Sequence, residues 1–209
     1  MKKITRKKHL EMRLQSIPAH PKPKVHLEQY TTPSIIASDL VWNAFSLDDI
    51  DGKTIFDLGC GTGIFTIASA LMGAELAVGV DIDPDSIDLA RDMSYNLNAD
   101  NVKFIKEDIA DFNCSHNVDT VFQNPPFGSQ RKSDSGQDLK FVKKAIDLET
   151  DVLYSFHMAS TEKFLMDYYK ENNLNITHVF RYSFPIPKIY DFHTKDNQNV
   201  NVIVLRAEL

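Results

Sequence analysis

The sequence predicts one α/β domain built on a parallel sheet, and three observations support this fold class. Short apolar runs alternate with longer amphipathic segments over most of the chain, which is typical of a sheet covered by helices on both faces. Three of the eight glycines fall between residues 59 and 63, where a predicted strand meets a predicted helix. The 209 residues are 43% hydrophobic and 25% charged, as in globular proteins, which excludes a fibrous or wholly disordered chain.

The elements follow from this alternation. A charged segment over 3–16 predicts a short helix, which the prolines at 18, 21 and 23 end. Thr32 followed by Pro33 predicts a helix N-cap and a helix that runs to about Phe45. The predicted strands span 54–58, 76–80, 102–106, 118–123, 152–156, 177–182 and 200–206, and the remaining predicted helices span 64–71, 84–96, 138–147 and 161–171. The last two strands have no helix between them and predict an antiparallel pair at one edge of the sheet.

The composition also excludes several classes of protein. No apolar run reaches the length of about 18 residues that a membrane-spanning helix needs. The charged start of the chain is unlike a secretory signal. Cys60 and Cys114 are too few for a disulfide framework or a four-thiolate zinc site, and a reducing, cytoplasmic location fits best. None of the seven histidines pairs with another or with a cysteine at the spacing of metal ligands, so no metal site is predicted.

Charge divides the chain into two parts. Residues 1–26 contain eight lysines and arginines and one acid, Glu11, so their net charge is +7. The whole chain has a net charge of −6, and residues 27–209 therefore carry −13. We therefore predict a basic N-terminal arm or helix over 1–26 and a single domain over 27–209. A basic arm on an acidic body indicates a nucleic-acid partner, although a solvated terminus would have the same composition.

The glycine-rich turn predicts a nucleoside-binding site. Gly59, Gly61 and Gly63 allow a ligand to approach the backbone closely, and Asp81, at the end of the next strand, could accept hydrogen bonds from a ribose diol. The spacing departs from the dinucleotide pattern, in which Ile64 would be a third glycine. Asp57 precedes the turn, and a carboxylate there would repel a pyrophosphate but attract the ammonium and sulfonium of S-adenosylmethionine. The charges therefore favour S-adenosylmethionine as the cofactor.

Three further residues complete the predicted cofactor site. Asp108 follows the next strand and could accept a hydrogen bond from the adenine amino group. Ile82 and Ile109 could pack on the two faces of the adenine ring. Each acid alone could equally be a loop residue or a helix cap, and Asp83 before Pro84 is predicted to be such a cap.

The segment Asn124-Pro125-Pro126-Phe127 carries the predicted chemistry. It follows the fourth strand, at the edge where open α/β sheets bind ligands. The amide oxygen of Asn124 and the carbonyl of Pro125 could accept the two hydrogens of a planar NH₂ group and free its lone pair to attack the methyl group. The prolines, including Pro126, stiffen the loop. Phe127 could stack on the plane of the substrate.

These motifs resemble class I S-adenosylmethionine-dependent methyltransferases of the amino-methylating kind. The closest resemblance is to the methyltransferase-like protein five family, the small-subunit ribosomal RNA N6-adenine methyltransferases, and their archaeal relatives. It rests on these motifs and on 27–32, 154–157 and 192–193. The resemblance implies a seven-stranded sheet of order 3-2-1-4-5-7-6, and a small zinc-binding activator protein as a possible partner. It also implies that Gln29, Tyr30 and Thr31 hold the methionine part of the cofactor, although the family usually has proline at the position of Thr31.

Substrate contacts are harder to predict. Arg131 and Lys132 could bind phosphate in a polar loop over 129–139. His157 could face the substrate, but a hydrogen-bonded structural histidine explains it better because amine methylation needs no base. In the last hairpin, aromatic rings could stack on flanking nucleotides or simply pack the hairpin, and the candidates are Tyr190, Phe192 and His193.

Together with the family resemblance, which implies small-subunit ribosomal RNA as the target, the sequence thus predicts N6-methylation of an adenosine in structured RNA. The Asn-Pro-Pro-aromatic pattern also suits a protein glutamine, a DNA adenine or guanine N2, since each presents NH₂ on a planar group. A second alternative is a cofactor-binding scaffold for ribosome assembly that has no turnover. The intact segment 124–127 argues against loss of catalysis.

Overall fold

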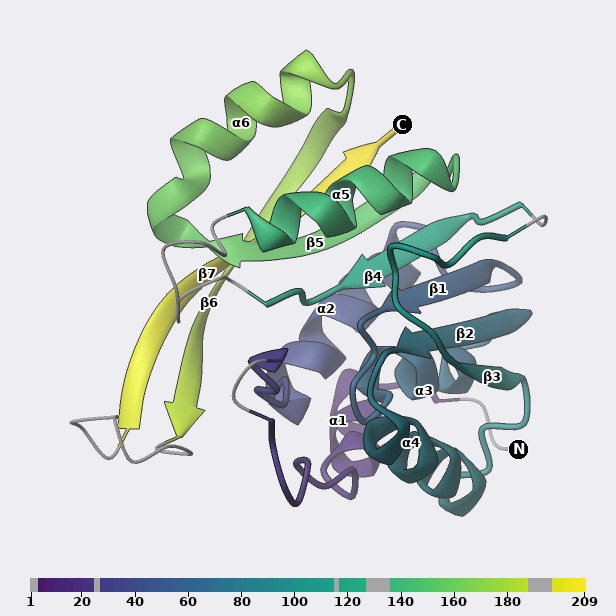
Figure 1. Cartoon of the computed structure of the whole chain (residues 1–209). Helices are drawn as coiled ribbons and strands as arrows, with labels where there is room; N and C mark the ends of the chain where they lie inside the picture. Colours follow the sequence, from purple (N-terminus) through teal and green to yellow (C-terminus); the bar gives the residue numbers. More distant parts are fainter. Residues whose placement is uncertain (1–3, 25–26, 115–116, 127–135, 188–196) are drawn as a thin grey trace.

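The computed structural model describes residues 4–24, 27–114, 117–126, 136–187 and 197–209, with the side chains of 185–187 and 197–198 excluded. One twisted sheet forms the centre of the molecule, and helices lie on both of its faces (Figure 1). The strands are β1 (Thr54–Leu58), β2 (Leu76–Asp81), β3 (Val102–Lys106), β4 (Thr120–Gln123), β5 (Val152–Met158), β6 (Asn175–Pro187) and β7 (Asn197–Glu208).

The sheet has the order β3-β2-β1-β4-β5-β7-β6, which confirms the order implied by the family resemblance. The first five strands run parallel, with Phe56 of β1 beside Val78 of β2 on one side and Val121 of β4 on the other. β7 is antiparallel to both β5 and β6. Because the strand order reverses direction at β1 and β4, the carboxyl ends of these strands open onto a crevice of the kind that binds ligands.

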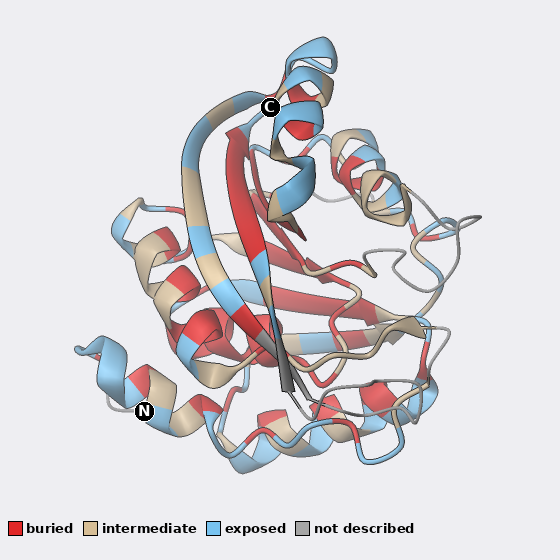
Figure 2. Ribbon diagram, turned by 90° about the vertical axis from the view of Figure 1, so that its left-hand side faces the viewer, coloured by how far each residue is buried: buried red, intermediate tan, exposed pale blue. Residues whose placement is uncertain are grey.

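Two apolar cores hold the layers together. The first lies between the sheet and helices α1 to α4 and includes Ile67 and Phe122, and the second lies under α5 and α6 and includes Val142 and Leu165. Figure 2 shows this burial as continuous buried stretches in the central strands and on the inner helix faces. The helices are α1 (Lys7–Leu14), α2 (Ser34–Ser46), α3 (Ile64–Leu71), α4 (Pro84–Asn96), α5 (Gln137–Asp147) and α6 (Glu162–Glu171), which a short 3₁₀ turn, η3 (Ala159–Thr161), precedes.

The basic N-terminal helix packs into the domain by its apolar side. Leu10, Leu14 and Ile17 are buried in the same core as α2 and α3. Lys7 forms an ion pair with Asp39 of α2 at 2.6 Å. The division of the chain at residue 26 stays a prediction, but the described part of 1–26 is anchored to the body rather than extended from it.

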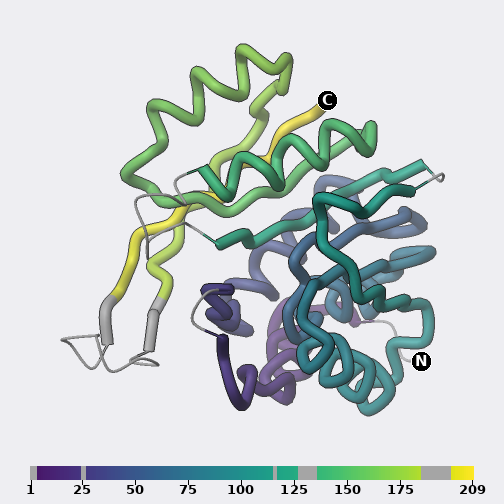
Figure 3. Tube along the Cα trace, in the orientation of Figure 1, coloured from purple at the N-terminus to yellow at the C-terminus, as the bar shows by residue number. Residues whose placement is uncertain are grey.

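The last two strands form a ribbon that reaches beyond the rest of the sheet. β5 pairs with β7 only from Val202 to Glu208, whereas β6 pairs with β7 along its whole length from Asn175 to Pro187. The outer part of the ribbon therefore consists of two strands, which leave the sheet on the side of the crevice (Figures 1 and 3). The prediction of an antiparallel pair is confirmed, but both strands are longer than expected.

Two predicted boundaries are wrong in an informative way. The first helix begins at Lys7 rather than at residue 3, because Arg6 is extended at φ −144°. Pro33, not Thr32, is the N-cap of α2, and no side chain caps this helix. The Thr32 hydroxyl instead bonds to Asn124, which lies 92 residues away. Within the described residues, no helix is both long and apolar enough to cross a membrane.

Candidate active site

A cavity of about 860 Å³ opens at the carboxyl ends of β1, β2 and β4. Its wall comes from three sources: the segment before α2, the turns after β1, β2, β3 and β4, and one side of α5. Most of the predicted cofactor residues line it, namely Gln29, Tyr30, Thr31, Asp57, Gly59, Gly61, Asp81, Ile82, Asp108 and Ile109, and so does Asn124, whereas Gly63 does not. The fold thus brings together residues from five separate segments.

The glycine turn forms the floor of this cavity. Gly59, Gly61 and Gly63 all have positive φ, at 71°, 51° and 81°. A Cβ atom on Gly63 would come within 3.0 Å of Ala90 and Phe104, so this glycine also allows α3 to begin close to α4 and β3. Only glycine combines this backbone conformation with such close approach at low cost.

Asp57 is a fully buried carboxyl group at the back of the cavity. One of its oxygens accepts hydrogen bonds from the Thr66 backbone N–H at 3.0 Å and from the Thr66 hydroxyl at 2.8 Å. Burial raises the pKa of Asp57 to about 7, although the bonds from Thr66 act in the opposite direction. Such a group gains most from a ligand that brings a positive charge.

Asp81 organises the turn that it faces. One carboxylate oxygen accepts from the Gly61 N–H at 2.7 Å, and the other accepts from the Asp83 N–H at 2.8 Å. Burial raises the pKa of Asp81 and outweighs these bonds. Each carboxylate oxygen can accept more than one hydrogen bond, so Asp81 can still receive the two hydroxyls of a ribose.

The loop after β3 forms the far end of the cavity. Asp108 is exposed and accepts a bond from the Ala110 N–H at 2.9 Å, which shapes the turn that carries Ile109. Lys144 of α5 is nearly buried, and its ammonium donates to the carbonyls of Phe112 at 2.8 Å and Ala110 at 3.4 Å. A helix on the other side of the cavity therefore holds this loop in place.

The described residues of 20–24 and 27–32 include the opposite wall of the cavity and are fastened to Asp83. Lys24 forms ion pairs with Asp83 at 2.5 Å and Asp85 at 3.3 Å. The Gln29 side chain donates to Asp83 at 2.7 Å and accepts from the Lys24 N–H at 2.7 Å. Asp83 also caps α4 by accepting from the Asp85 N–H, as predicted. Burial opposes ionisation of Asp83, but the bonds from Lys24, Gln29 and Asp85 outweigh it and lower its pKa.

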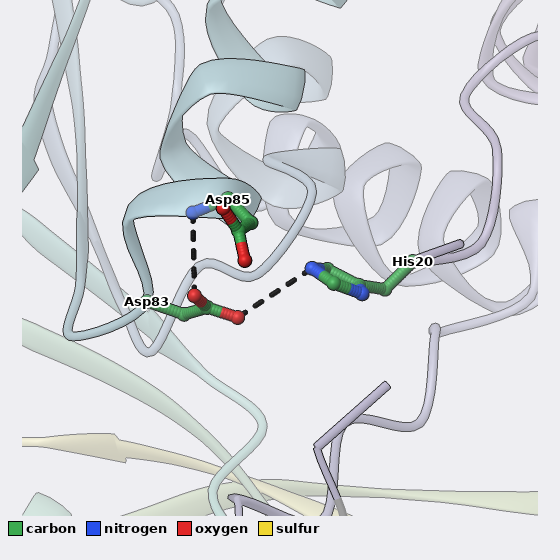
Figure 4. A group of neighbouring side chains, drawn as sticks. All are labelled: His20, Asp83 and Asp85. Carbon is green, nitrogen blue, oxygen red and sulfur yellow. Dashed lines mark hydrogen bonds and ion pairs between the residues drawn. The ribbon is translucent and has the colours of Figure 1, made fainter. Parts of the chain in front are cut away.

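His20 points into the same cluster (Figure 4). Its Nε2 lies 3.5 Å from the Asp83 carboxylate, and its Nδ1 accepts from the Lys22 N–H at 3.1 Å. Within the part of the chain that the structure describes, His20, Asp83 and Asp85 are a group whose ligand atoms converge to within 4.8 Å, a geometry that could suit a metal ion. The Lys24 ammonium already pairs with both carboxylates, so we interpret the cluster as an anchor for this segment.

Asn124 stands where the cavity meets a second, smaller hollow. The hollow is about 20 Å³ and is lined by Glu28, Tyr30, Asn124, Pro125, Pro126, Phe184, Val200 and Val202. Glu28, Tyr30, Asn124 and Pro126 line both spaces. A group bound at the mouth of the hollow and a cofactor in the cavity would therefore meet at Asn124.

His157 lies outside both spaces. Its side chain is fully buried, and its ring nitrogens bond to Asp138 at 2.7 Å and to the Tyr169 hydroxyl at 3.0 Å. These contacts join β5 to α5 and α6. Of the two roles considered for His157, substrate contact and structural support, they match structural support. Six predicted site residues lie outside the described residues: Phe127, Arg131, Lys132, Tyr190, Phe192 and His193.

The described residues fit S-adenosylmethionine. Asp57 offers a negative charge for the amino acid end, Asp81 offers acceptors for the ribose, and Ile82, Ile109 and Asp108 surround a space for the adenine. Ile82 is 45% exposed at this cavity, an unusual degree for isoleucine that a bound ring would reduce. Sequence reasoning missed Lys144, His20 and the role of Thr32, whose partners are distant in the chain.

Comparison with known proteins decides the family. The model described as "Methyltransferase domain" matches residues 49–178. The rRNA N(6)-adenosine-methyltransferase METTL5 of Danio rerio is 33% identical over 95% of this chain and 97% of its own. The chain belongs to the METTL5 family of class I, S-adenosylmethionine-dependent methyltransferases.

Further relatives also match this chain over nearly its whole length. An uncharacterized protein of Methanocaldococcus jannaschii is 39% identical over 98% of this chain and 95% of its own. A crystal structure from Pyrococcus horikoshii is 36% identical, with a TM-score of 0.87 over 98% of each chain. Membership of the METTL5 family therefore rests on nearly the whole molecule, including the segment before α2 and the β6–β7 ribbon.

Proposed function

We propose that this protein transfers the methyl group of S-adenosylmethionine to the N6 atom of an adenosine in ribosomal RNA. The observation that carries the proposal is the position of Asn124 between the cofactor cavity and the smaller hollow, with Pro125 beside it in the wall of the hollow. The METTL5 relatives of Danio rerio and Drosophila melanogaster are named rRNA N(6)-adenosine-methyltransferases, which supports the same substrate.

The cofactor supplies a methyl group on a positively charged sulfur, and the chain supplies position and hydrogen-bond acceptors. The Asn124 amide oxygen and the Pro125 carbonyl would each accept one hydrogen of the target amine. This orientation would direct the nitrogen lone pair at the methyl carbon that the cofactor supplies. The amine then loses a proton to solvent, which requires no strong base in the site.

The target base must leave its stack to reach the site. The small hollow accepts the amino edge of a base rather than a whole ring, and its wall contains the rings of Tyr30 and Phe184. Unstacking costs a few kcal/mol. The two hydrogen bonds to the amine, together with contacts to Tyr30, would offset part of this cost.

A transfer assay tests the proposal. The protein is incubated with tritiated S-adenosylmethionine and, separately, with small-subunit RNA, large-subunit RNA, DNA and total protein from a strain that lacks the gene. The labelled pool is digested, and the modified nucleoside or amino acid is identified by mass. Asn124→Ala is the matched control, because it removes the amide and leaves the cofactor acids in place.

The expected result is N6-methyladenosine in small-subunit RNA with the wild-type protein and none with Asn124→Ala. Label in guanosine, DNA or glutamine would overturn the proposed substrate and leave the chemistry. Cofactor binding without label in any pool would favour the scaffold alternative, provided that an activator protein has been supplied.

The activator is the second part of the proposal. β3 pairs only with β2 and β6 only with β7, so both edges of the sheet have no further strand beside them within the described residues. An edge strand can accept a strand from another protein. We expect a small zinc-binding protein to raise the stability and the activity of this chain, measured by melting temperature and by methyl transfer with and without it. No disulfide joins Cys60 and Cys114, which fits the expected cytoplasmic location.

A further inference from the structure

We propose that Gln123 is a positioning residue that ties the end of β4 to α5 and so holds Asn124 and Pro125 in place for methyl transfer. The inference rests on the proposed chemistry of Asn124 and adds a residue to it. Gln123 is the last residue of β4, and its side chain is fully buried. It lines neither the cofactor cavity nor the smaller hollow, so its role can be separated from binding of the cofactor.

A buried amide in an apolar strand needs hydrogen-bond partners, because an unpaired one is costly to remove from water. Gln123 finds them under α5. Its Nε2 atom donates to the Phe141 carbonyl at 3.1 Å. Its Oε1 atom accepts from the Val142 backbone N–H at 3.3 Å and from the Ser155 hydroxyl at 2.9 Å. One side chain of β4 therefore contacts both the main chain of α5 and the neighbouring strand β5.

The two main-chain partners decide the orientation of this amide. A carbonyl can only accept a hydrogen bond and a backbone N–H can only donate one. The reversed amide would face the Phe141 carbonyl with its own oxygen and the Val142 N–H with its own NH₂. The Ser155 hydroxyl can serve either orientation. The second turn of α5 therefore selects one arrangement, in which Gln123 joins the helix to the strand.

The helix that receives Gln123 is itself held from below by polar groups. Asp138, in the first turn of α5, is bonded to His157 Nδ1 at 2.7 Å, and His157 Nε2 to the Tyr169 hydroxyl at 3.0 Å. The Tyr169 hydroxyl is also hydrogen-bonded to Ser155, the partner of Gln123. The first turn of α5 is thus tied to β5 and α6, and the second turn is tied to β4 through Gln123.

The position of Gln123 passes directly to the reacting segment. Side chains alternate along a strand, so Gln123 faces α5 and Asn124 faces the opposite side, where its amide bonds to Thr32. Consecutive Cα atoms are about 3.8 Å apart, so a shift of Gln123 moves Asn124 with it. Pro125 and Pro126 restrict the backbone that follows and leave it little freedom to compensate. A displaced strand end would carry both acceptors away from the target amine.

Two variants of the same strand separate positioning from stability. Gln123→Met keeps a similar length but removes the amide. The matched control is Thr120→Val at the other end of β4, where the buried hydroxyl donates to the Asp49 carbonyl at 2.8 Å. Each variant removes buried hydrogen bonds and should lower the melting temperature by about 2–8 °C.

Only Gln123→Met should slow the reaction. We expect its single-turnover rate, at saturating cofactor and RNA, to fall by about 10- to 100-fold, because small displacements of reacting groups cost this much. Thr120→Val should stay within about threefold of wild type. The cofactor Kd should stay within about threefold of wild type in both variants. If Gln123→Met does not fold, Ser155→Ala removes one partner of the amide and should slow transfer by about fivefold.

A second readout does not depend on RNA. Hydrogen exchange of residues 137–147 should be faster in Gln123→Met than in the wild type, because α5 loses its tie to β4. Exchange over this helix should be unchanged in Thr120→Val. If the wild-type protein methylates no substrate while exchange behaves in this way, the proposed function fails and the tie between β4 and α5 stands.

Four results would overturn the inference. The first is a wild-type rate in Gln123→Met, or in Ser155→Ala where that variant replaces it. The second is an equal loss of rate in Thr120→Val, and the third is a loss that weaker cofactor binding fully explains. The fourth is unchanged exchange of α5 in Gln123→Met, which would show that the amide does not hold the helix.

Discussion

Asp57 should make cofactor binding depend on pH. Its pKa is about 7 because burial disfavours the charged form more than the bonds from Thr66 favour it. A cofactor that carries an ammonium group should bind the ionised form, so binding below pH 7 must first remove a proton from Asp57. Affinity should therefore rise with pH up to about 7 and then level off.

The pKa sets the size of the effect. One pH unit below a pKa of about 7 lowers the affinity by about tenfold, so the Kd at pH 5 should be about 100-fold weaker than the plateau. Above about pH 8 the amino group of the cofactor itself loses its proton, and the affinity should fall again. The optimum thus lies in a narrow range above neutrality.

The same shift has the opposite sign for stability. The folded pKa of Asp57 lies above its unfolded value of 3.8. Its stabilising contribution is therefore complete below about pH 4 and is lost as the pH rises through 7. Asp57→Asn should raise the melting temperature of the cofactor-free protein at pH 8 while it weakens cofactor binding.

Isothermal titration calorimetry from pH 5 to 8, in buffers of different ionisation enthalpy, measures the affinity and the protons released. The wild type should release about one proton on binding at pH 6. Asp57→Asn should bind weakly at pH 8 and show no such dependence below pH 7. A flat wild-type profile between pH 5 and 7, or the same slope in Asp57→Asn, would refute the reasoning.

Three further predictions concern the supports of the site. Gly63→Ala places a Cβ within 3.0 Å of Ala90 and Phe104 at a φ of 81°, and should lower the free energy of unfolding in urea by about 1–3 kcal/mol; an unchanged midpoint would contradict this. Lys144→Met removes the ammonium that donates to the loop after β3 and should weaken cofactor binding by about tenfold. A wild-type Kd would show that this loop keeps its conformation without Lys144. Asp83→Asn removes the partner of the anchored segment and should speed hydrogen exchange over residues 27–31; unchanged exchange would refute the anchor.

The cofactor half of the site could be predicted from sequence because its determinants are local. Glycines at a junction of strand and helix predict a tight turn, and acids at the ends of parallel strands predict side chains at the ligand-binding edge of the sheet. Asp57 and Asp81 both line the cavity as expected. The central strands were also predicted closely, because buried parallel strands are apolar over their whole length.

The missing parts depend on contacts that no short window contains. Thr32 before proline has the local pattern of a helix cap, but its hydroxyl instead accepts a hydrogen bond from Asn124, in the loop after β4. His20 in the cavity wall meets Asp83, which lies far from it in the sequence at the start of α4. The ribbon was predicted too short since its outer residues face no third strand and so lack a continuous apolar pattern.

The most direct test of the central claim is the N6-methyladenosine content of small-subunit ribosomal RNA from a strain in which this gene is deleted. Mass spectrometry of the digested RNA should show the loss of this nucleoside. A plasmid that encodes the wild-type chain should restore it, and one that encodes Asn124→Ala should not. Unchanged N6-methyladenosine in the deletion strain, or full restoration by Asn124→Ala, would contradict the account.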